Sequence, residues 1–203
     1  MRPLARFLSI ILHPLLMPTL VFWLALQMDP HLAYFMGDEQ RWITVGMVAL
    51  MTIGFPITSV LLLLRTGMLT DLTMPTRQER IAPYAMTLAY YGMAWYLLGR
   101  SPLHPAAVAL ATGAFLSLFA TLVITFRWKI SAHMVGIGGA LGAMIGLQLA
   151  HGVSLFVPIA ALIVIAGALG TARLIDGDHT PAQIYAGVLV GAACTVATIV
   201  VAG

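Results

Sequence analysis

Two histidines with nearby cations are the residues of this chain best suited to chemistry. Five residues separate Arg173 from His179, and three residues separate Lys129 from His133. An apolar run follows each pair, so each pair is expected where a loop meets a membrane helix. Guanidinium and ammonium groups bind phosphate oxygens, and an imidazole is largely unprotonated near neutral pH. The two pairs together indicate an anion site that could carry out phosphoryl chemistry.

The composition shows that membrane helices must position these residues. Of the 203 residues, 61% are hydrophobic and 8% are charged, whereas about 25% of the residues of a soluble domain are charged. The chain is too short for a membrane bundle plus a large soluble domain, so residues 1–203 are expected to form a single transmembrane domain. The single cysteine, Cys194, excludes a disulfide framework and a cysteine-rich metal site.

The predicted fold is an all-α, polytopic transmembrane helical bundle. A helix that crosses a bilayer needs about 20 mainly apolar residues. Seven segments have about this length, namely 7–27, 43–64, 81–98, 103–126, 133–150, 154–171 and 182–202. Segment 81–98 is short and contains Pro83, so six spans are the alternative to seven. His13-Pro14 and Pro18 predict a kink in the first span, and a role in admitting substrate is a further interpretation of this break.

The parity of the spans places three loops on one face of the membrane. These loops follow the second, fourth and sixth spans and carry Arg77 and Arg80, then Lys129 and His133, then Arg173 and His179. With the N-terminus inside, this face receives eight Lys and Arg residues against two on the other. The bias favours an inner membrane of a bacterium with the site on the cytoplasmic face. The net charge of +3 therefore indicates orientation and phosphate binding, with no nucleic acid as partner.

Local signals place both histidines near helix starts. Thr180 and Gln183 form the pattern of a capping box, with Pro181 in the first turn, so His179 lies just before a helix N-terminus where anions are favoured. Ser131 could cap the helix that follows it or bind phosphate. The alternative for His179 is a polar residue resting at the interface, and for His133 a side chain that faces a water-filled vestibule.

The spacing of these residues resembles the type 2 phosphatidic acid phosphatase superfamily of integral membrane phosphatases. That family ends in Ser-Arg-x5-His-x3-Asp, preceded by Pro-Ser-Gly-His and by Lys-x6-Arg-Pro. Here the matching residues are Arg173 and His179 in the last element and Ser131 and His133 in the second, and the resemblance covers about residues 70–190. The first element matches only loosely, through Arg77-Gln-Glu-Arg80.

The resemblance implies a metal-independent and cofactor-free lipid phosphate or pyrophosphate phosphatase with a phosphohistidine intermediate. His179 would be the nucleophile and His133 would protonate the leaving alcohol. The cations that would hold the phosphoryl group are Arg173 and Lys129, with Arg77 or Arg80, and Ser131 would add a hydroxyl. Arg77 and Arg80 could equally be topology signals.

The chain departs from the family pattern at three places. Ala172 replaces the serine before the arginine, and the second element lacks its proline and glycine. Gln183 stands where the family has the aspartate that orients the nucleophile, and an amide contributes less electrostatic help. Asp176 or Asp178 could substitute for that aspartate or could form a local ion pair with Arg173. The alternative function is therefore a weak or inactive lipid-phosphate or anion binder or transporter.

Two further patterns have structural interpretations. The remaining histidines, His13, His31, His104 and His151, are scattered without His-x3-His spacing, so no metal site is expected. Glycines recur at every fourth position in two stretches, 138–146 and 187–191, and predict close helix packing inside the bundle. The sequence does not specify an oligomeric state, and membrane lipids and a lipid phosphate are the expected partners.

Overall fold

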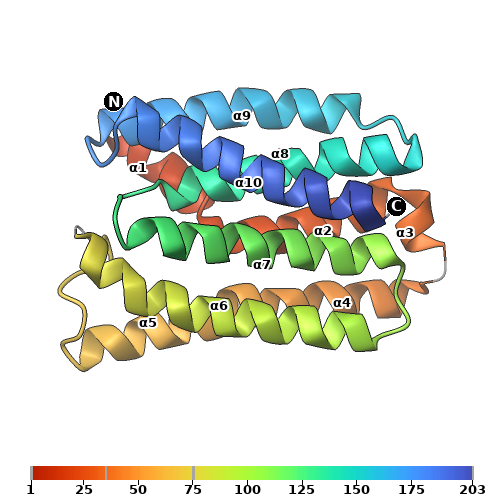
Figure 1. Ribbon diagram of the computed structural model, residues 1–203, viewed down its shortest axis with the longest axis horizontal. Helices are drawn as coiled ribbons and strands as arrows, with labels where there is room; N and C mark the ends of the chain where they lie inside the picture. The colour runs from red at the N-terminus through yellow and green to blue at the C-terminus, as the bar shows by residue number, and fades with distance from the viewer. Residues whose placement is uncertain (1, 35, 75, 203) are drawn as a thin grey trace.

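The computed structural model describes residues 2–34, 36–74 and 76–202, and in these ranges the chain is helical with no strand. Long helices lie side by side along one axis and form a bundle (Figure 1). Six helical segments are long and apolar enough to cross a membrane, which makes the chain an integral membrane protein with an all-α, polytopic fold. The predicted fold class is confirmed.

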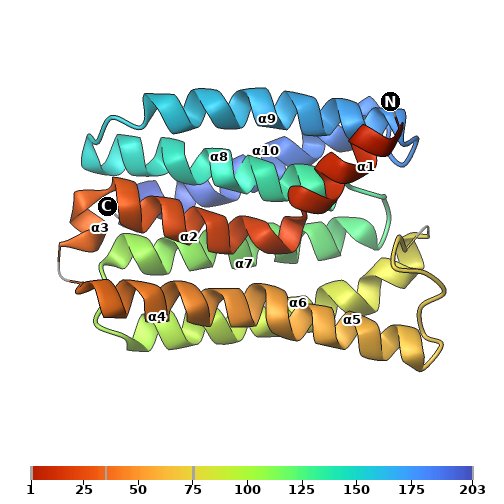
Figure 2. The ribbon, with the colours of Figure 1, turned by 180° about the vertical axis from the view of Figure 1, so that it is seen from behind.

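The first span is broken in its middle, as His13-Pro14 and Pro18 predict. Helix α1 (Arg2–Ile11) ends before a single turn of 3-10 helix, η1 (Pro14–Leu16), and α2 (Met17–Met28) follows. Proline supplies no backbone N–H for a helical hydrogen bond, so the helix is interrupted at this point. The His13 Nδ1 accepts a hydrogen bond of 3.4 Å from the backbone N–H of Leu15 and caps the short turn. Figure 2 shows the resulting angle between α1 and α2.

The second span is also irregular. A short helix, α3 (Pro30–Ala33), leads into α4 (Asp38–Ala49), which continues through the π-helical turn η2 (Leu50–Gly54) into α5 (Phe55–Arg65). Such π-turns occur mostly inside α-helices and frequently at functional sites. The Thr52 hydroxyl in this turn lies 3.0 Å from the Thr19 hydroxyl of α2, so the turn packs against the first span.

Helix α6 (Arg77–Arg100) corresponds to the predicted segment 81–98 but begins four residues earlier, because Thr76 caps it. The Thr76 hydroxyl donates to Glu79 Oε1 at 2.9 Å and accepts the backbone N–H of Glu79 at 3.4 Å. Its 24 residues span about 36 Å, yet α6 is not among the six apolar candidate spans. Tyrosines, glycine and charged residues lower its hydropathy. The remaining long helices are α7 (Pro105–Thr125), α8 (Ala132–His151), α9 (Phe156–Ile175) and α10 (Pro181–Ala202).

Helices α8 and α10 cross at their glycines with almost no space between their backbones. A Cβ on Gly142 would lie 2.5 Å from the backbone oxygen of Ala192, and a Cβ on Gly187 would lie 2.9 Å from that of Ser131. Small residues permit such close approach in membrane helices. The predicted packing role of the two glycine stretches is confirmed.

The three loops that carry the candidate site residues lie at one end of the bundle. They join α5 to α6, α7 to α8 and α9 to α10, and all three turn at the end where the chain begins (Figure 1). The α8–α9 connection and α3 lie at the opposite end. The three loops therefore bring the candidate site residues to the same end of the bundle.

Candidate active site

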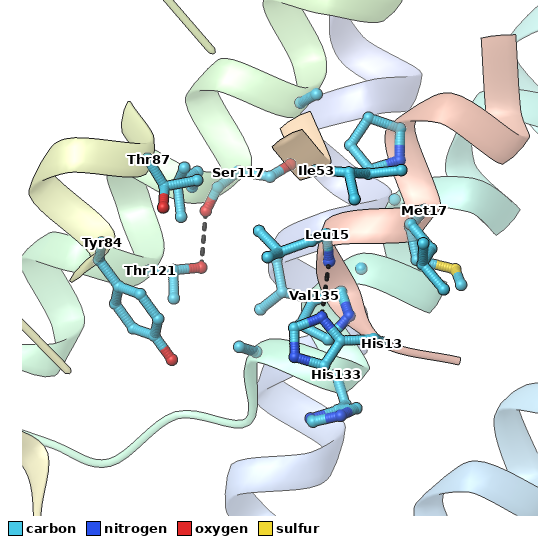
Figure 3. A pocket seen from close by; sticks show the side chains of 18 of the residues that line it. His13, Leu15, Met17, Ile53, Tyr84, Thr87, Ser117, Thr121, His133 and Val135 are labelled. Carbon is cyan, nitrogen blue, oxygen red and sulfur yellow. Dashed lines mark hydrogen bonds between the residues drawn. The ribbon is translucent and has the colours of Figure 1, made fainter. Parts of the chain in front are cut away.

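A cavity of about 540 Å³ lies among α1, α2, α5, α6, α7 and α8. Its walls are mainly aliphatic, but its loop-side end is polar, with Arg80 from the first turn of α6, His133 from the first turn of α8 and Arg173 from the last turn of α9. His13, from the break in the first span, and Tyr84 also line this end (Figure 3). The cavity therefore combines an apolar volume with a cationic end.

The cavity reaches the outer surface between the first two spans. Ile10 of α1 is 71% exposed and also lines the cavity, as do Ile57 and Leu61 of α5, each 46% exposed. These side chains lie at the middle and loop-side parts of membrane helices, where the surrounding medium is lipid. An amphipathic molecule could therefore reach the cavity sideways from the bilayer.

Ser9 of α1 connects the two histidine elements. The Nε2 of His133 lies 3.1 Å from the backbone oxygen of Ser9, which can only accept, so this nitrogen carries a hydrogen. Arg173 Nη1 donates to the Ser9 hydroxyl at 3.2 Å. The His13 ring packs edge-on against the His133 ring with centroids 5.5 Å apart. The predicted partners His133 and Arg173 thus meet through a residue of the first span.

The contacts of His179 fix which of its ring nitrogens is protonated. Gln183 Oε1 accepts the backbone N–H of Thr180 at 3.1 Å, which identifies it as the amide oxygen, and it lies 3.1 Å from His179 Nδ1. An oxygen without hydrogen can only accept, so Nδ1 carries the hydrogen and Nε2 keeps its lone pair. The Gln183 backbone N–H also contacts the Thr180 hydroxyl at 3.4 Å, which confirms the predicted capping box.

His179 is neutral at physiological pH. The side chain lies in the loop outside the membrane spans and is 7% exposed. Its pKa is lowered from 6.5 to about 4, chiefly by burial and also by the positive charges of Arg173, Arg80 and Lys129, while the hydrogen bond to Gln183 opposes the shift. A neutral imidazole with a free Nε2 lone pair is a competent nucleophile or base.

Two acids already engage Arg173. Its side chain is 9% exposed, and Nη2 donates to Asp178 at 2.6 Å while Nη1 lies 3.7 Å from Asp176. Its Nε is buried and has no hydrogen-bond partner among the described residues. The structure therefore places Asp176 and Asp178 in the ion-pair arrangement, and Gln183 holds His179.

The other predicted cations have different positions. Arg80 is 7% exposed, and its Nε donates to the backbone oxygen of Met74 at 3.0 Å. Lys129 is partly buried in the α7–α8 loop, and its pKa is lowered by burial and by the nearby charges of Arg80 and Arg173, although Asp178 raises it. Arg77 is exposed and donates to the backbone oxygen of Phe126 at 3.0 Å, a contact that ties α6 to the end of α7.

Ser131 occupies the N-cap position of α8, but its side chain makes no capping hydrogen bond. The residue is fully buried at the contact with α10, and its hydroxyl has no partner among the described residues. Ser131, Lys129 and His179 do not line the cavity, whereas His133 and Arg173 do. The geometry therefore divides the predicted residues into a group that lines the cavity and a group that lies outside it.

Sequence reasoning missed several polar residues of the cavity. His13 comes from the first span, where the His13-Pro14 break was the one indication of an irregular region. Ser9, from the same span, contacts His133 and Arg173 but does not line the cavity. Ser117 and Thr121 line the wall from α7, where each hydroxyl donates 2.7 Å to the backbone oxygen four residues earlier and keeps its acceptor capacity. Tyr84 lies on the opposite side from His13 (Figure 3).

Comparison of the chain with protein-family models, with curated proteins and with solved structures gave no match. The chemistry of the site must therefore be inferred from its own contacts.

Proposed function

We propose that this protein is a membrane-embedded phosphatase that acts on a lipid phosphate or pyrophosphate. The observation that carries the proposal is the cavity, whose apolar walls end at Arg80, Arg173 and His133. An anionic headgroup at this end would be neutralised by guanidinium groups, while a hydrocarbon chain would fill the aliphatic part. A cavity of about 540 Å³ falls within the range of small-molecule sites, about 300–1,000 Å³.

His179 supplies the nucleophile in this proposal. Its Nε2 attacks phosphorus, the bond between phosphorus and the ester oxygen breaks, and His133, protonated when the phosphate anion lies beside it, gives a proton to the leaving oxygen. Water then attacks phosphorus, His133 takes up the proton of that water, the nitrogen–phosphorus bond breaks and phosphate is released. Gln183 accepts the Nδ1–H as the ring becomes cationic, and Arg80, Lys129 and Arg173 stabilise the phosphoryl oxygens.

For this chemistry the phosphoryl group must lie next to Arg173, with His133 on its cavity side and His179 on its loop side. The resemblance of the Arg173–His179 spacing to the type 2 phosphatidic acid phosphatase superfamily supports the assignment. The excess of Lys and Arg on the loop-side face favours the cytoplasmic face of a bacterial inner membrane as the location.

The second candidate function is binding or transport of a lipid phosphate without turnover. It is favoured by the ion pairs of Arg173, because a substrate phosphate must compete with Asp178 for the same Nη2 group. The amide of Gln183 in place of a carboxylate points in the same direction.

Phosphate release from a panel of lipid phosphates and polyprenyl pyrophosphates separates the two candidates. Purified wild-type protein in detergent micelles is expected to release phosphate, and His179→Ala is expected to fall to the uncatalysed background. His104→Asn is the matched control, because it replaces a histidine at the opposite end of the bundle and keeps a capping side chain before α7. Equal release from wild type and His179→Ala would exclude the phosphatase.

A binding measurement then tests the second candidate. Spin-labelled or fluorescent phosphatidate is expected to bind wild-type protein more tightly than Arg80→Gln, because the substitution removes one cation from the polar end of the cavity. Binding without release would establish the anion-binding function, and absence of both would reject the site.

A further inference from the structure

A second polar cluster lies at the end of the bundle opposite to the candidate active site. It joins Asp29, between α2 and α3, with His31 of α3 and His151, the last residue of α8. One ligand atom from each of the three residues lies within 4.8 Å of the others. These histidines are scattered in the sequence, but they meet in space because the α8–α9 connection and α3 turn at the same end (Figure 1).

Both imidazoles direct the same nitrogen at one carboxylate. His31 Nδ1 lies 3.1 Å from Asp29 Oδ1, and His151 Nδ1 lies 2.5 Å from Asp29 Oδ2. The backbone N–H of His31 also donates to Asp29 Oδ1 at 3.0 Å and fixes the orientation of the carboxylate. A metal ion would take the place of the hydrogens in these two contacts, and each neutral ring would then carry its hydrogen on Nε2.

The carboxylate of Asp29 is completely buried, and its side-chain exposure is 0%. Within the described chain it forms ion pairs only with the two histidines and with no lysine or arginine. A buried carboxylate is costly unless a cation compensates it. A divalent ion bound to the two imidazoles would provide that compensation.

His151 supplies an independent sign. Its side chain is 6% exposed, and Nε2 has no hydrogen-bond partner among the described residues. The ring packs against His31 at 4.8 Å and edge-on against His104 at 5.2 Å between centroids. The polar contact that the described residues give this buried ring is therefore made through Nδ1, the nitrogen that faces Asp29.

We propose that Asp29, His31 and His151 bind a divalent transition metal of the zinc class through one carboxylate oxygen and the two Nδ1 atoms. Imidazole and carboxylate are ordinary zinc ligands at about 2.0–2.2 Å. Ligand atoms around a tetrahedral zinc ion are about 3.3 Å apart, so side-chain rotations must draw the three groups together from within 4.8 Å.

His104 lies beside the site and is not one of its ligands. Its Nδ1 accepts the backbone N–H of Ala106 at 3.2 Å as the cap of α7. In that tautomer the neutral ring carries its hydrogen on Nε2, which leaves no lone pair there for a metal. The site therefore has three protein ligands, so the fourth position of a tetrahedral zinc ion would take a water molecule, and it joins the α2–α3 corner to the end of α8.

Zinc content of the full-length protein tests this proposal. The protein is purified in detergent without a polyhistidine tag, stripped with a chelator, reloaded with zinc and desalted. Wild type is expected to retain about one zinc per chain, measured by atomic emission. Asp29→Asn keeps a side chain that accepts the His31 N–H, and it is expected to lose most of the zinc.

The matched variants make the result decisive. His104→Asn is expected to retain the zinc of wild type. His31 is exposed, with 54% of its side chain accessible, so His31→Gln is expected to fold and to lose zinc even if Asp29→Asn fails to fold. Cobalt bound to wild type is expected to give visible absorption bands that zinc abolishes. Wild type without zinc, or His31→Gln with a full complement, would overturn the proposal.

Discussion

Replacement of the Gln183 amide by a carboxylate of the same length tests the contact that fixes the His179 tautomer. Gln183→Glu keeps the reach that brings one oxygen to 3.1 Å from His179 Nδ1 and from the Thr180 N–H. An adjacent negative charge raises the pKa of a histidine by about 1–3. The pKa of His179, about 4 in wild type, is therefore expected to reach about 5–7 in the variant.

The same substitution is expected to accelerate phosphate release. As the His179 ring becomes cationic in the reaction, the carboxylate stabilises it by the same free energy that raises its pKa. A rise of about 1 in the pKa corresponds to about 1.4 kcal/mol and therefore to a roughly tenfold higher rate. Assays at pH 8 keep His179 neutral in both proteins, so the comparison reports the hydrogen bond rather than the protonation state.

Two measurements follow this change. The titration of His179 is read from the imidazole signals of protein labelled with carbon-13 histidine, and turnover is read from phosphate release. Gln148→Glu is the matched control, because Gln148 accepts the Leu155 N–H at 2.9 Å at the far end of α8. A His179 titration that is identical in wild type and Gln183→Glu would refute the proposed contact, whatever the rate.

Two further predictions concern stability. Gly191→Ala is expected to lower the free energy of unfolding by about 1–3 kcal/mol, because the added Cβ meets the backbone oxygen of Val135; Gly167→Ala, where a Cβ meets nothing within 4 Å, should cause no loss in thermal unfolding of either purified variant. Because the His179 pKa is lowered to about 4 from 6.5, the unfolded chain binds its proton first as pH falls. The free energy of unfolding should therefore decrease between pH 6.5 and pH 4 by about 3 kcal/mol, and a stability profile of His179→Gln that keeps this slope would contradict the assignment.

Local signals in the sequence predicted those parts of the structure that depend on a few neighbouring residues. The capping pair of Thr180 and Gln183, the break at His13-Pro14 and the close packing of the glycine stretches all follow from hydrogen bonding or steric size within one or two helices. The predicted start of α6 was less accurate. The hydropathy pattern excluded the charged residues 77–80 from the helix, but Thr76 caps the helix just before them.

The parts that sequence could not predict depend on which helix ends meet. Ser9 lies 164 positions from Arg173 and 124 from His133, yet contacts both. Asp29 and His151 are 122 positions apart and share a hydrogen bond. None of these three pairs has a spacing motif, because the contacts depend on how the first span packs against α8 and α9. The cavity has the same origin, since residues of eight helices line it.

The glycine contact between α8 and α10 has a mechanical consequence. Two helices whose backbones touch cannot roll or slide without losing contact along their length, so they behave as one stiff frame. The first two spans instead contain their irregular turns, η1 and η2, and both turns border the cavity. We therefore expect the cavity to widen for a bulky hydrocarbon tail through movement of the first two spans, while His133 of α8 keeps its position.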